Sequence, residues 1–424
     1  MFYQRLINDG LAPAAVHLVE ETEQSEAVIR ATARTRDIAA SNGLKVLHAM
    51  QHSRLSDSHF VDSTGYGYHD VGRAALEATF AAIFHAEAAL VRPQLISGTH
   101  ALAVALFGNL RPGDTLYSPV GAPYDTLESV IGIRPAIGSL AEYGVAYRQT
   151  PLTPEGGFDL PAIRRTLTEC AAIRMVTIQR SKGYAWRPSF TIAQIESLIR
   201  EIRALRPDIC IMVDNCYGEF VEEREPIEAG ADLIAGSLIK NPGGGIAPGG
   251  GYVAGKADYV ARAATRLTAP GIGAEVGPTL GMTRALLTGL FLAPQTVCHC
   301  IEGAILAAAV FERLGFPVNP APDAVRTDIV QAIQLGDAQK VLAFCRGIQR
   351  AAPVDSFVTP EAAPMPGYAD GVVMAGGTFV QGSSIELSAD APMRPPYNMF
   401  LQGGLTAAHA RAGVVYAVDA VQQC

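Results

Sequence analysis

Hydrophobic residues recur at helical spacing in the first part of the chain, between residues 14 and 52. The apolar positions lie among Glu and Arg side chains, as in a helix that buries one face. They are Val16, Leu18, Val19, Val28, Ile29 and Ile38. The pattern predicts a helical N-terminal arm, of a kind that often packs on a neighbouring subunit.

Short apolar runs then alternate with helical patterns. The runs lie at 145–148, 175–179 and 209–214, and helical segments at 161–169 and 191–205 separate them. Strands that alternate with helices form a parallel sheet covered on both faces. Ligands of such sheets bind at the carboxyl ends of the strands, so residues just after these runs are candidates for a site.

The pattern changes again after about residue 290. A long helical pattern at 297–314 is followed by proline-rich turns, by strand candidates near Asp323–Val330 and Val354–Val358, and by a last helix at 403–421. This order is typical of a small α+β domain. The predicted units are an arm at 1–60, a large α/β domain at 61–290 and a small domain at 291–424.

Composition narrows the function classes. The 424 residues are 49% hydrophobic and 17% charged, with a formal net charge of −8. This is the composition of a large globular protein and not of a disordered one. Because no Lys/Arg cluster stands out, a nucleic-acid or anionic-membrane partner is not expected.

Cysteines and termini point to a cytoplasmic protein without a metal. The seven cysteines are an odd number spread over a long chain, which disfavours a disulfide framework. The Cys298–Cys300 spacing fits no usual zinc pattern. The first ten residues have no apolar signal core, and the most hydrophobic stretch, 285–310, is interrupted by polar residues.

Lys240 is the strongest candidate for chemistry. It follows an apolar run that reads as a buried strand, and a glycine-rich loop at 241–251 comes after it. Burial lowers the pKa of a lysine and makes its amine a nucleophile able to form a Schiff base. A solvated lysine on a loop would give the same local pattern, so residues elsewhere in the chain are needed to distinguish the two.

Two further segments could complete a site. Ser97, Gly98 and Thr99 open an Ala/Leu-rich helix after a short apolar run, and a helix N-terminus of small residues can bind an anion. Asp214 ends a buried strand. Ser97 or Thr99 could equally be an N-cap, and so could Asp214.

Two more segments carry ligand-binding residue types. Residues 63–73 alternate glycines with aromatics, including Tyr66 and Tyr68, so that backbone and rings can approach a ligand or another chain. Arg394 stands before a double proline that would hold it rigidly, and arginine matches a carboxylate. A surface loop is the alternative for residues 63–73, and an ordinary surface salt bridge is the alternative for Arg394.

Seven motifs follow one another along the chain: GYGYHDVGR (65–73), SGTHAL (97–102), GAPYDTLE (121–128), IQRSKGYAWRPS (178–189), DNCYGEF (214–220), GSLIKNPGGGIAPGGGY (236–252) and SIELSADAPMRPPY (384–397). In this order, they resemble those of the fold-type-I pyridoxal-phosphate enzymes of cysteine and methionine metabolism. More closely, the chain is similar to the methionine gamma-lyase-like family often labelled "aluminium resistance protein". The resemblance implies an aspartate-aminotransferase-like fold.

The resemblance also implies roles. Lys240 would hold pyridoxal 5′-phosphate as a Schiff base, and Asp214 would pair with the pyridine nitrogen. Tyr124 would stack on the ring and move a proton to the leaving group. Gly98, Thr99 and Ser237, with Ser97 beside them, would bind the phosphate.

Further roles involve the substrate and a second subunit. Arg394 would bind the substrate α-carboxylate. Tyr66, with Tyr68 or Arg73, would reach the neighbouring subunit's site, implying a homodimer that pairs into a tetramer. Gln179, Arg180 and Ser181 would contact the cofactor's phenolic oxygen or the substrate carboxylate.

The implied activity is γ-elimination or γ-substitution on a four-carbon amino acid. Methionine, cystathionine, an O-acylhomoserine and canavanine share that skeleton, and no residue chooses among them. β-Elimination from cystathionine or cysteine is the first alternative, and aldol cleavage or transamination is the second. A non-catalytic cofactor-binding protein with a regulatory or metal-tolerance role is a third.

Overall fold

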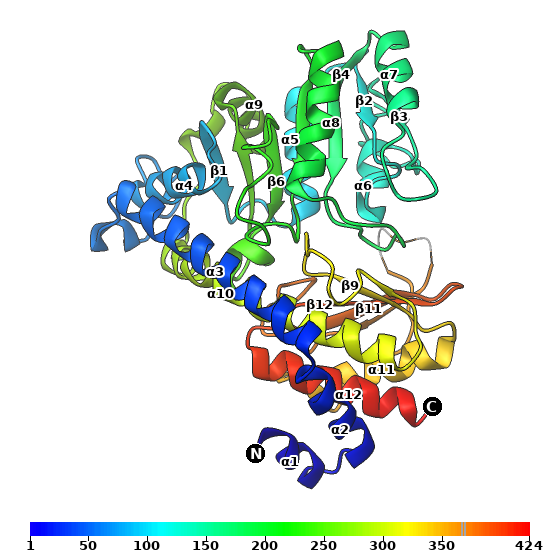
Figure 1. The fold of residues 1–424 in the computed structure, drawn as a ribbon. Helices are drawn as coiled ribbons and strands as arrows, with labels where there is room; N and C mark the ends of the chain where they lie inside the picture. The colour runs from blue at the N-terminus through cyan, green and yellow to red at the C-terminus, as the bar shows by residue number, and fades with distance from the viewer. Residues whose placement is uncertain (366–367, 369) are drawn as a thin grey trace.

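The computed structural model describes residues 1–365, 368 and 370–424, and it places two sheets one above the other (Figure 1). The large sheet has the strand order β1-β7-β6-β5-β4-β2-β3. Its strands are β1 (Ala88–Arg92), β2 (Thr115–Ser118), β3 (Ala146–Gln149), β4 (Ile173–Gln179), β5 (Cys210–Asp214), β6 (Leu233–Ser237) and β7 (Gly251–Gly255). The five strands from β6 to β3 pair in parallel, and β7 pairs antiparallel with both β6 and β1.

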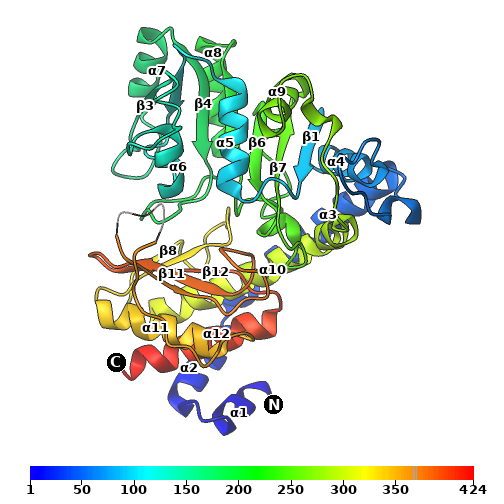
Figure 2. The same cartoon turned by 180° about the vertical axis from the view of Figure 1, so that it is seen from behind.

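Helices cover both faces of this sheet, as Figures 1 and 2 show from opposite sides. Alternate residues of β5 enter different cores: Ile211 and Val213 face one, Cys210 and Met212 the other. This two-residue period sorts the strands' apolar side chains between the two helical layers. The helices are α3 (Glu26–His52), α4 (Val71–Ile83), α7 (Leu160–Glu169) and α8 (Ile192–Leu205) on the first face, and α5 (Gly98–Asn109), α6 (Asp125–Ile131) and α9 (Ala257–Leu267) on the second.

The small C-terminal sheet is entirely antiparallel, in the order β10-β11-β12-β9-β8. Its strands are β8 (Val318–Asn319), β9 (Gln331–Gln334), β10 (Val372–Ala375), β11 (Ser388–Pro392) and β12 (Asn398–Gln402). Helices α11 (Ala338–Ala351) and α12 (Ala407–Gln422) pack on it together with α1 (Phe2–Asn8) and α2 (Pro13–Glu23). The predicted α/β fold with a smaller α+β part is therefore confirmed.

Two strand predictions in the small domain are wrong. The segment at 323–330 is irregular because its side chains bond to nearby backbone in place of a strand partner: the Asp328 carboxylate accepts the Val330 N–H, and the Arg326 guanidinium donates to the Ala321 carbonyl just before the segment. The segment at 354–358 turns at Asp355, whose φ of +50° is incompatible with an extended strand.

The long helix α10 (Thr283–Arg313) connects the two sheets and supports the glycine loop after Lys240. It is long and apolar enough to cross a membrane by composition, yet 72% of its most apolar window is buried, as in a core helix. A Cβ added at Gly289 would lie 2.1 Å from the Gly243 carbonyl oxygen. The helix and the loop therefore touch backbone to backbone.

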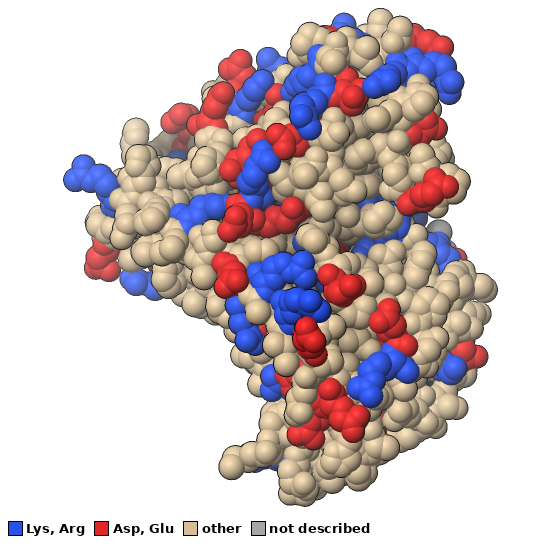
Figure 3. Space-filling view, in the orientation of Figure 1, with Lys and Arg blue, Asp and Glu red and all other residues tan. Residues whose placement is uncertain are grey.

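On the face shown in Figure 3, Lys and Arg side chains are interspersed with Asp and Glu. Charges of both signs lie over the large and the small domain in that view. The arrangement matches the modest acidic balance of the composition and gives that face no single-sign field that would steer a polyanion.

The backbone contact at Gly289 leads to a stability prediction. Gly289→Ala must push the Gly243 loop away from α10, and overpacking of this kind costs about 1–3 kcal/mol. Gly43→Ala is the matched control, because Gly43 lies in α3 with nothing within 4 Å of an added Cβ. There we expect stabilisation of up to about 1 kcal/mol. Urea unfolding of both variants checks this, and equal effects would contradict it.

Candidate active site

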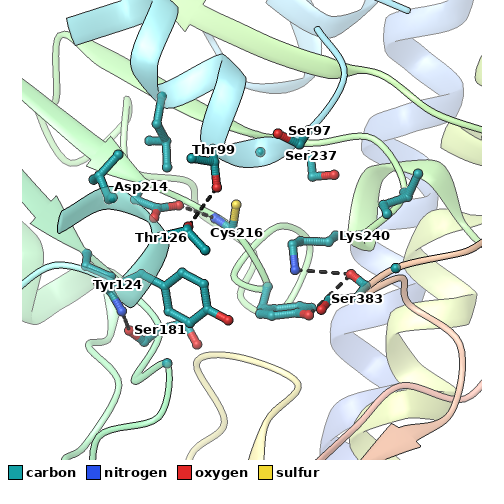
Figure 4. Close-up of a pocket in the computed structure, with 18 of the residues that line it drawn as sticks. Ser97, Thr99, Tyr124, Thr126, Ser181, Asp214, Cys216, Ser237, Lys240 and Ser383 are labelled. Carbon is teal, nitrogen blue, oxygen red and sulfur yellow. Dashed lines mark hydrogen bonds between the residues drawn. The ribbon is translucent and has the colours of Figure 1, made fainter. Parts of the chain in front are cut away.

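A cavity of about 310 Å³ opens where the carboxyl ends of β4, β5 and β6 meet the start of α5 and a segment of the small domain (Figure 4). The position agrees with the expectation for a parallel sheet. Many of the predicted site residues line this cavity together: Ser97, Gly98, Thr99, Tyr124, Gln179, Ser181, Asp214, Ser237 and Lys240.

Lys240 reaches the cavity just after β6, and its environment disfavours a charge. Its Nζ donates to the Ser383 carbonyl at 3.1 Å and lies 3.6 Å from the centre of the Tyr217 ring. Among the described residues, no carboxylate forms an ion pair with it. Burial lowers the pKa of Lys240, with partial opposition from nearby Cys216 and Asp214. This is the state in which a lysine amine is a nucleophile and a base.

Asp214 ends β5 in the wall of the cavity, with 8% of its surface exposed. Its Oδ1 accepts the backbone N–H of Cys216 at 3.1 Å, and no described cation pairs with it. Burial raises the pKa of Asp214, against the hydrogen bonds from Cys216 and the charge of Lys240. A ligand with a protonated nitrogen would supply the missing positive charge and favour the carboxylate.

The N-terminus of α5 forms another wall. Ser97 is its N-cap, since its hydroxyl accepts the His100 N–H at 3.1 Å. A Cβ at Gly98 would lie 3.3 Å from both Cys216 Sγ and Ser237 Cβ, so a larger residue would have to move the helix start and β6 apart by a few tenths of an ångström. The Thr99 and Thr126 hydroxyls lie 2.8 Å apart. Hydroxyls and free N–H groups at a helix start fit a phosphate.

Tyr124 belongs to a group of four tyrosines, and the sequence analysis assigned a role to Tyr124 but not to the other three. Its hydroxyl lies 2.7 Å from that of Tyr368, and Tyr184 is in ring contact with both. Burial raises the pKa of Tyr124 well above its ordinary value, so it holds its proton. The fourth ring, Tyr217, is the one beneath Lys240.

Asp390, on β11, lies behind these rings with 4% of its surface exposed. Gln402 donates to it at 3.3 Å, and burial raises its pKa to about 7. The signal for it was present in the sequence as a lone acid within the apolar SADAP segment. Tyr184 and Tyr217 likewise lay inside the recognised motifs.

The structure corrects the role of Arg180. Its side chain is completely buried away from the cavity and donates to Asn215 Oδ1 at 2.9 Å, to the Gly218 carbonyl at 2.8 Å and to Glu222 at 2.8 Å. It holds the turn after β5. Arg73 is similar, since it donates to the Gly67 and Gly277 carbonyls.

The remaining predicted residues lie outside this cavity. Tyr66 and Tyr68 are 69% and 63% exposed, and their ring centres are 5.5 Å apart. Arg394 lines a neighbouring cavity of about 270 Å³ and pairs with Asp370 at 2.6 Å. Within the described part of the chain, no group of three or more His, Cys, Asp or Glu is arranged to hold a metal.

Asp390 gives the site a testable pH dependence. In the unfolded chain its carboxyl has the ordinary pKa of 3.8, whereas the folded protein raises it to about 7. Between these values the unfolded state releases the proton first, so the wild type loses stability as pH rises. Relative to the wild type, Asp390→Asn should therefore become more stable by about 4 kcal/mol between pH 4 and pH 8.

Urea unfolding at several pH values measures this difference. Asp208→Asn is the control, because Asp208 is exposed and paired with Arg206, and its pKa is lowered to about 2. The free energy of unfolding of Asp208→Asn should differ from that of the wild type by an amount that does not change with pH above pH 4. A flat difference for Asp390→Asn as well would contradict the buried, proton-bearing carboxyl.

Comparisons with known proteins identify the family of this chain. The methionine gamma-lyase family model matches residues 17–422. A Clostridium acetobutylicum protein provisionally described as a cystathionine beta-lyase involved in aluminium resistance is 49% identical, covers 98% of each chain and superposes with a TM-score of 0.95. A Clostridium novyi carbon-sulfur lyase involved in aluminium resistance is 48% identical, with 98% of each chain covered and a TM-score of 0.94.

A more distant structure supports the fold. The pyridoxal-5′-phosphate-dependent protein YhfS of Escherichia coli is 17% identical and superposes with a TM-score of 0.61, over 95% of this chain and 98% of its own. The resemblance stated from the motifs is thus confirmed, and the chain belongs to the methionine gamma-lyase family.

Proposed function

We propose that the protein is a pyridoxal-phosphate-dependent lyase that eliminates or substitutes a heteroatom group at Cγ of a four-carbon amino acid. One observation carries the proposal: an unpaired lysine amine, an unpaired carboxylate and a helix N-terminus face one cavity. Each of the three lacks the partner that one part of this cofactor would supply. When bound, the cofactor withdraws electrons from the substrate Cα.

The residues present fit that group. Lys240 would hold its aldehyde carbon, Asp214 its ring nitrogen, and the α5 start with Ser237 its phosphate. Gly98 lets the helix start and Ser237 lie close together, which would place both of them at the phosphate. The 310 Å³ volume is within the usual range for small-molecule sites.

The chain's own side chains can perform the proton transfers. The lowered pKa of Lys240 makes its amine a base for the Cα proton, and it could take a Cβ proton only after it has released the first. Tyr124, whose raised pKa keeps it protonated, can deliver a proton to the departing heteroatom. Arg394, in the adjoining cavity, is proposed to bind the α-carboxylate.

β-Elimination from cystathionine is the second candidate, because a relative with 49% identity carries that description. Both reactions begin with removal of the Cα proton and use the same residues. Aldol cleavage or transamination on the same fold, and a non-catalytic regulatory or metal-tolerance role, are weaker proposals. A base, an acid and a carboxylate-binding arginine together exceed what cofactor binding needs.

We also propose a cytoplasmic homodimer that pairs into a tetramer. Tyr66 and Tyr68 support this, since two adjacent exposed tyrosines on a glycine-rich loop fit an interface better than bulk solvent. In such a dimer they would complete the partner's site.

The first test addresses Lys240. The purified protein should show the visible absorption of bound pyridoxal phosphate, and Lys240→Ala should abolish it together with all turnover. Lys256→Ala is the control, because Lys256 is 56% exposed and pairs with Asp232; its spectrum should match the wild type. An unchanged spectrum in Lys240→Ala would remove the cofactor assignment.

The second test addresses the bond that is cleaved. The protein is incubated separately with methionine, cystathionine, O-acetylhomoserine and canavanine, and 2-oxobutanoate, homoserine and pyruvate are assayed. Four-carbon products are expected if elimination or substitution occurs at Cγ. Pyruvate from cystathionine without 2-oxobutanoate would establish the β-lyase instead, and no product from any of the four would favour the non-catalytic role.

A further inference from the structure

The loop between β4 and α8, residues 180–190, supplies walls to both cavities of the candidate site. Ser181 lines the first cavity (Figure 4), Arg187 lines the second, and Gly183 lines both. Wall residues that sit on a loop keep a cavity in shape only if other contacts hold that loop still. Two sets of contacts do this, one within the loop and one from the small domain.

Within the loop, Arg187 ties the chain to the end of β4. Its guanidinium donates to the Gln179 carbonyl at 3.0 Å and to the Ser181 carbonyl at 2.6 Å, and it lies 4.8 Å from the centre of the Phe190 ring. The side-chain amide of Gln179 donates to the same Ser181 carbonyl at 2.9 Å. Ser181 is therefore the residue at which the strand end and the loop are joined.

From the small domain, the side chain of Asp328 holds this loop. Its carboxylate accepts the Ser181 hydroxyl at 2.7 Å and accepts the Ser189 hydroxyl at the same oxygen. The other oxygen accepts the Val330 N–H at 3.0 Å, and Asp328 is only 2% exposed. One buried acid of the small domain thus holds both ends of a loop of the large domain.

Asp328 is a strong acceptor because it stays ionised. Burial alone would raise its pKa, but the charge of Lys182 and the hydroxyls of Ser181 and Ser189 outweigh burial and keep the pKa below its ordinary value of 3.8. Hydrogen bonds to an ionised acceptor are roughly twice as strong as those between neutral groups. Lys182 adds a second link between the domains, since its Nζ donates to the Asn319 carbonyl at 3.2 Å.

These contacts also fix the direction of Gln179. Because its amide nitrogen donates to the Ser181 carbonyl, its buried amide oxygen is left without a partner among the residues that the structure describes. Gln179 lines both cavities. Buried polar atoms are normally hydrogen-bonded, so this oxygen is an acceptor for an N–H or O–H group of a ligand.

Glycine at position 183 lets the loop lie close to these groups. Gly183 has a φ of +56°, and a Cβ there would lie 2.9 Å from Tyr124 Cδ2 and 3.1 Å from Gln179 Nε2. The loop is therefore packed directly against Tyr124 and Gln179, and a shift of the loop would move the walls of both cavities.

We propose that Asp328 is a positioning residue of the active site: from the small domain it holds Ser181 and Ser189, and so keeps the loop and Gln179 in the cavity walls. The term active site rests on the proposed function, whereas the hold of Asp328 on the loop does not. The small domain thereby shapes the site through a side chain that lines neither cavity.

The test uses Trp186, the only tryptophan of the chain, which lies in this loop and is 40% exposed. Asp328→Asn keeps the shape of the side chain but removes its charge and one of its two acceptor oxygens. The loop should then open locally while the rest of the protein stays folded. Because opening exposes the remainder of the indole ring, we expect quenching of Trp186 fluorescence by acrylamide to rise about twofold.

Asp419→Asn is the matched control. Asp419 is also a 2% exposed acid of the small domain that accepts a backbone N–H, from Ala12 at 3.0 Å, and its other contacts are with Gln423 and Arg350. Both variants are measured without denaturant, where circular dichroism shows them folded. Asp419→Asn should quench as the wild type does. An equal rise in both variants would indicate general loosening and would overturn the proposal.

Serine variants cover the case in which Asp328→Asn does not fold. Ser181→Ala and Ser189→Ala each remove one hydroxyl donor and leave the charge of Asp328 in place, so quenching should rise in both. Wild-type quenching in both would overturn the proposal. Where Asp328→Asn folds, adding Ser181→Ala to it should raise quenching no further, because the two changes break the same contact.

The full-length protein as purified is used throughout, and none of these measurements needs turnover. A wild type without the visible absorption of bound pyridoxal phosphate would overturn the proposed function and leave the result for Asp328 unaffected. Conversely, unchanged quenching in Asp328→Asn would overturn the role of Asp328 and leave the cofactor assignment of Lys240 unaffected.

Discussion

The site depends on an amine held at the edge of a sheet without an acid to neutralise it. Lys240 is fixed by a main-chain carbonyl of Ser383 and by the face of Tyr217, both of which tolerate a neutral amine. A carboxylate in either place would raise the pKa of Lys240 and tie up its lone pair. The glycine loop that follows keeps this geometry rigid, because Gly243 lies against Gly289 of α10.

Burial also explains the shifted pKa values of the acids around Lys240. Burial raises the pKa of Asp214, of Asp390 to about 7 and of Glu219 to about 8, while it lowers that of Lys240. Desolvation disfavours the charged form of each of these groups, so each is drawn toward its neutral form. A ligand that brings a positive ring nitrogen and a negative phosphate would reverse that tendency at Asp214 and at the α5 start. The protein thus provides sites for charges that it does not itself carry.

Much of the arrangement could be predicted, because strand ends are visible in the sequence. Asp214, Ser237 and Lys240 follow apolar runs, and in a parallel sheet such ends meet at one edge. The motif IQRSKGYAWRPS does not indicate which of its side chains point into the cavity. Gln179 and Ser181 line the cavity and Arg180 between them points away, which is the two-residue alternation of a strand continued past its end.

Other features depend on contacts between distant segments, which local patterns do not encode. Tyr368 meets Tyr124 across more than two hundred residues of sequence, and its hydroxyl contact exists only because the small domain lies under the large sheet. The failed strand at 323–330 has a related cause. Asp328 is committed to Ser181 and Ser189 of the other domain, so its segment bends to reach them.

In the proposed reaction, the choice of leaving group would depend on the walls of the cavity and not on the residues that transfer protons. Lys240 would fix where the substrate's nitrogen-bearing carbon lies. The substrate's side chain then has to extend along the remaining wall of the first cavity, which includes Ile96, Leu102 and Leu127. Ile96 is 80% exposed, so that wall is open at its outer end. An apolar wall with an open end constrains the first carbons of a side chain more tightly than the group that leaves it. Such a shape supports the proposal that substrates share a four-carbon skeleton and differ in their leaving groups.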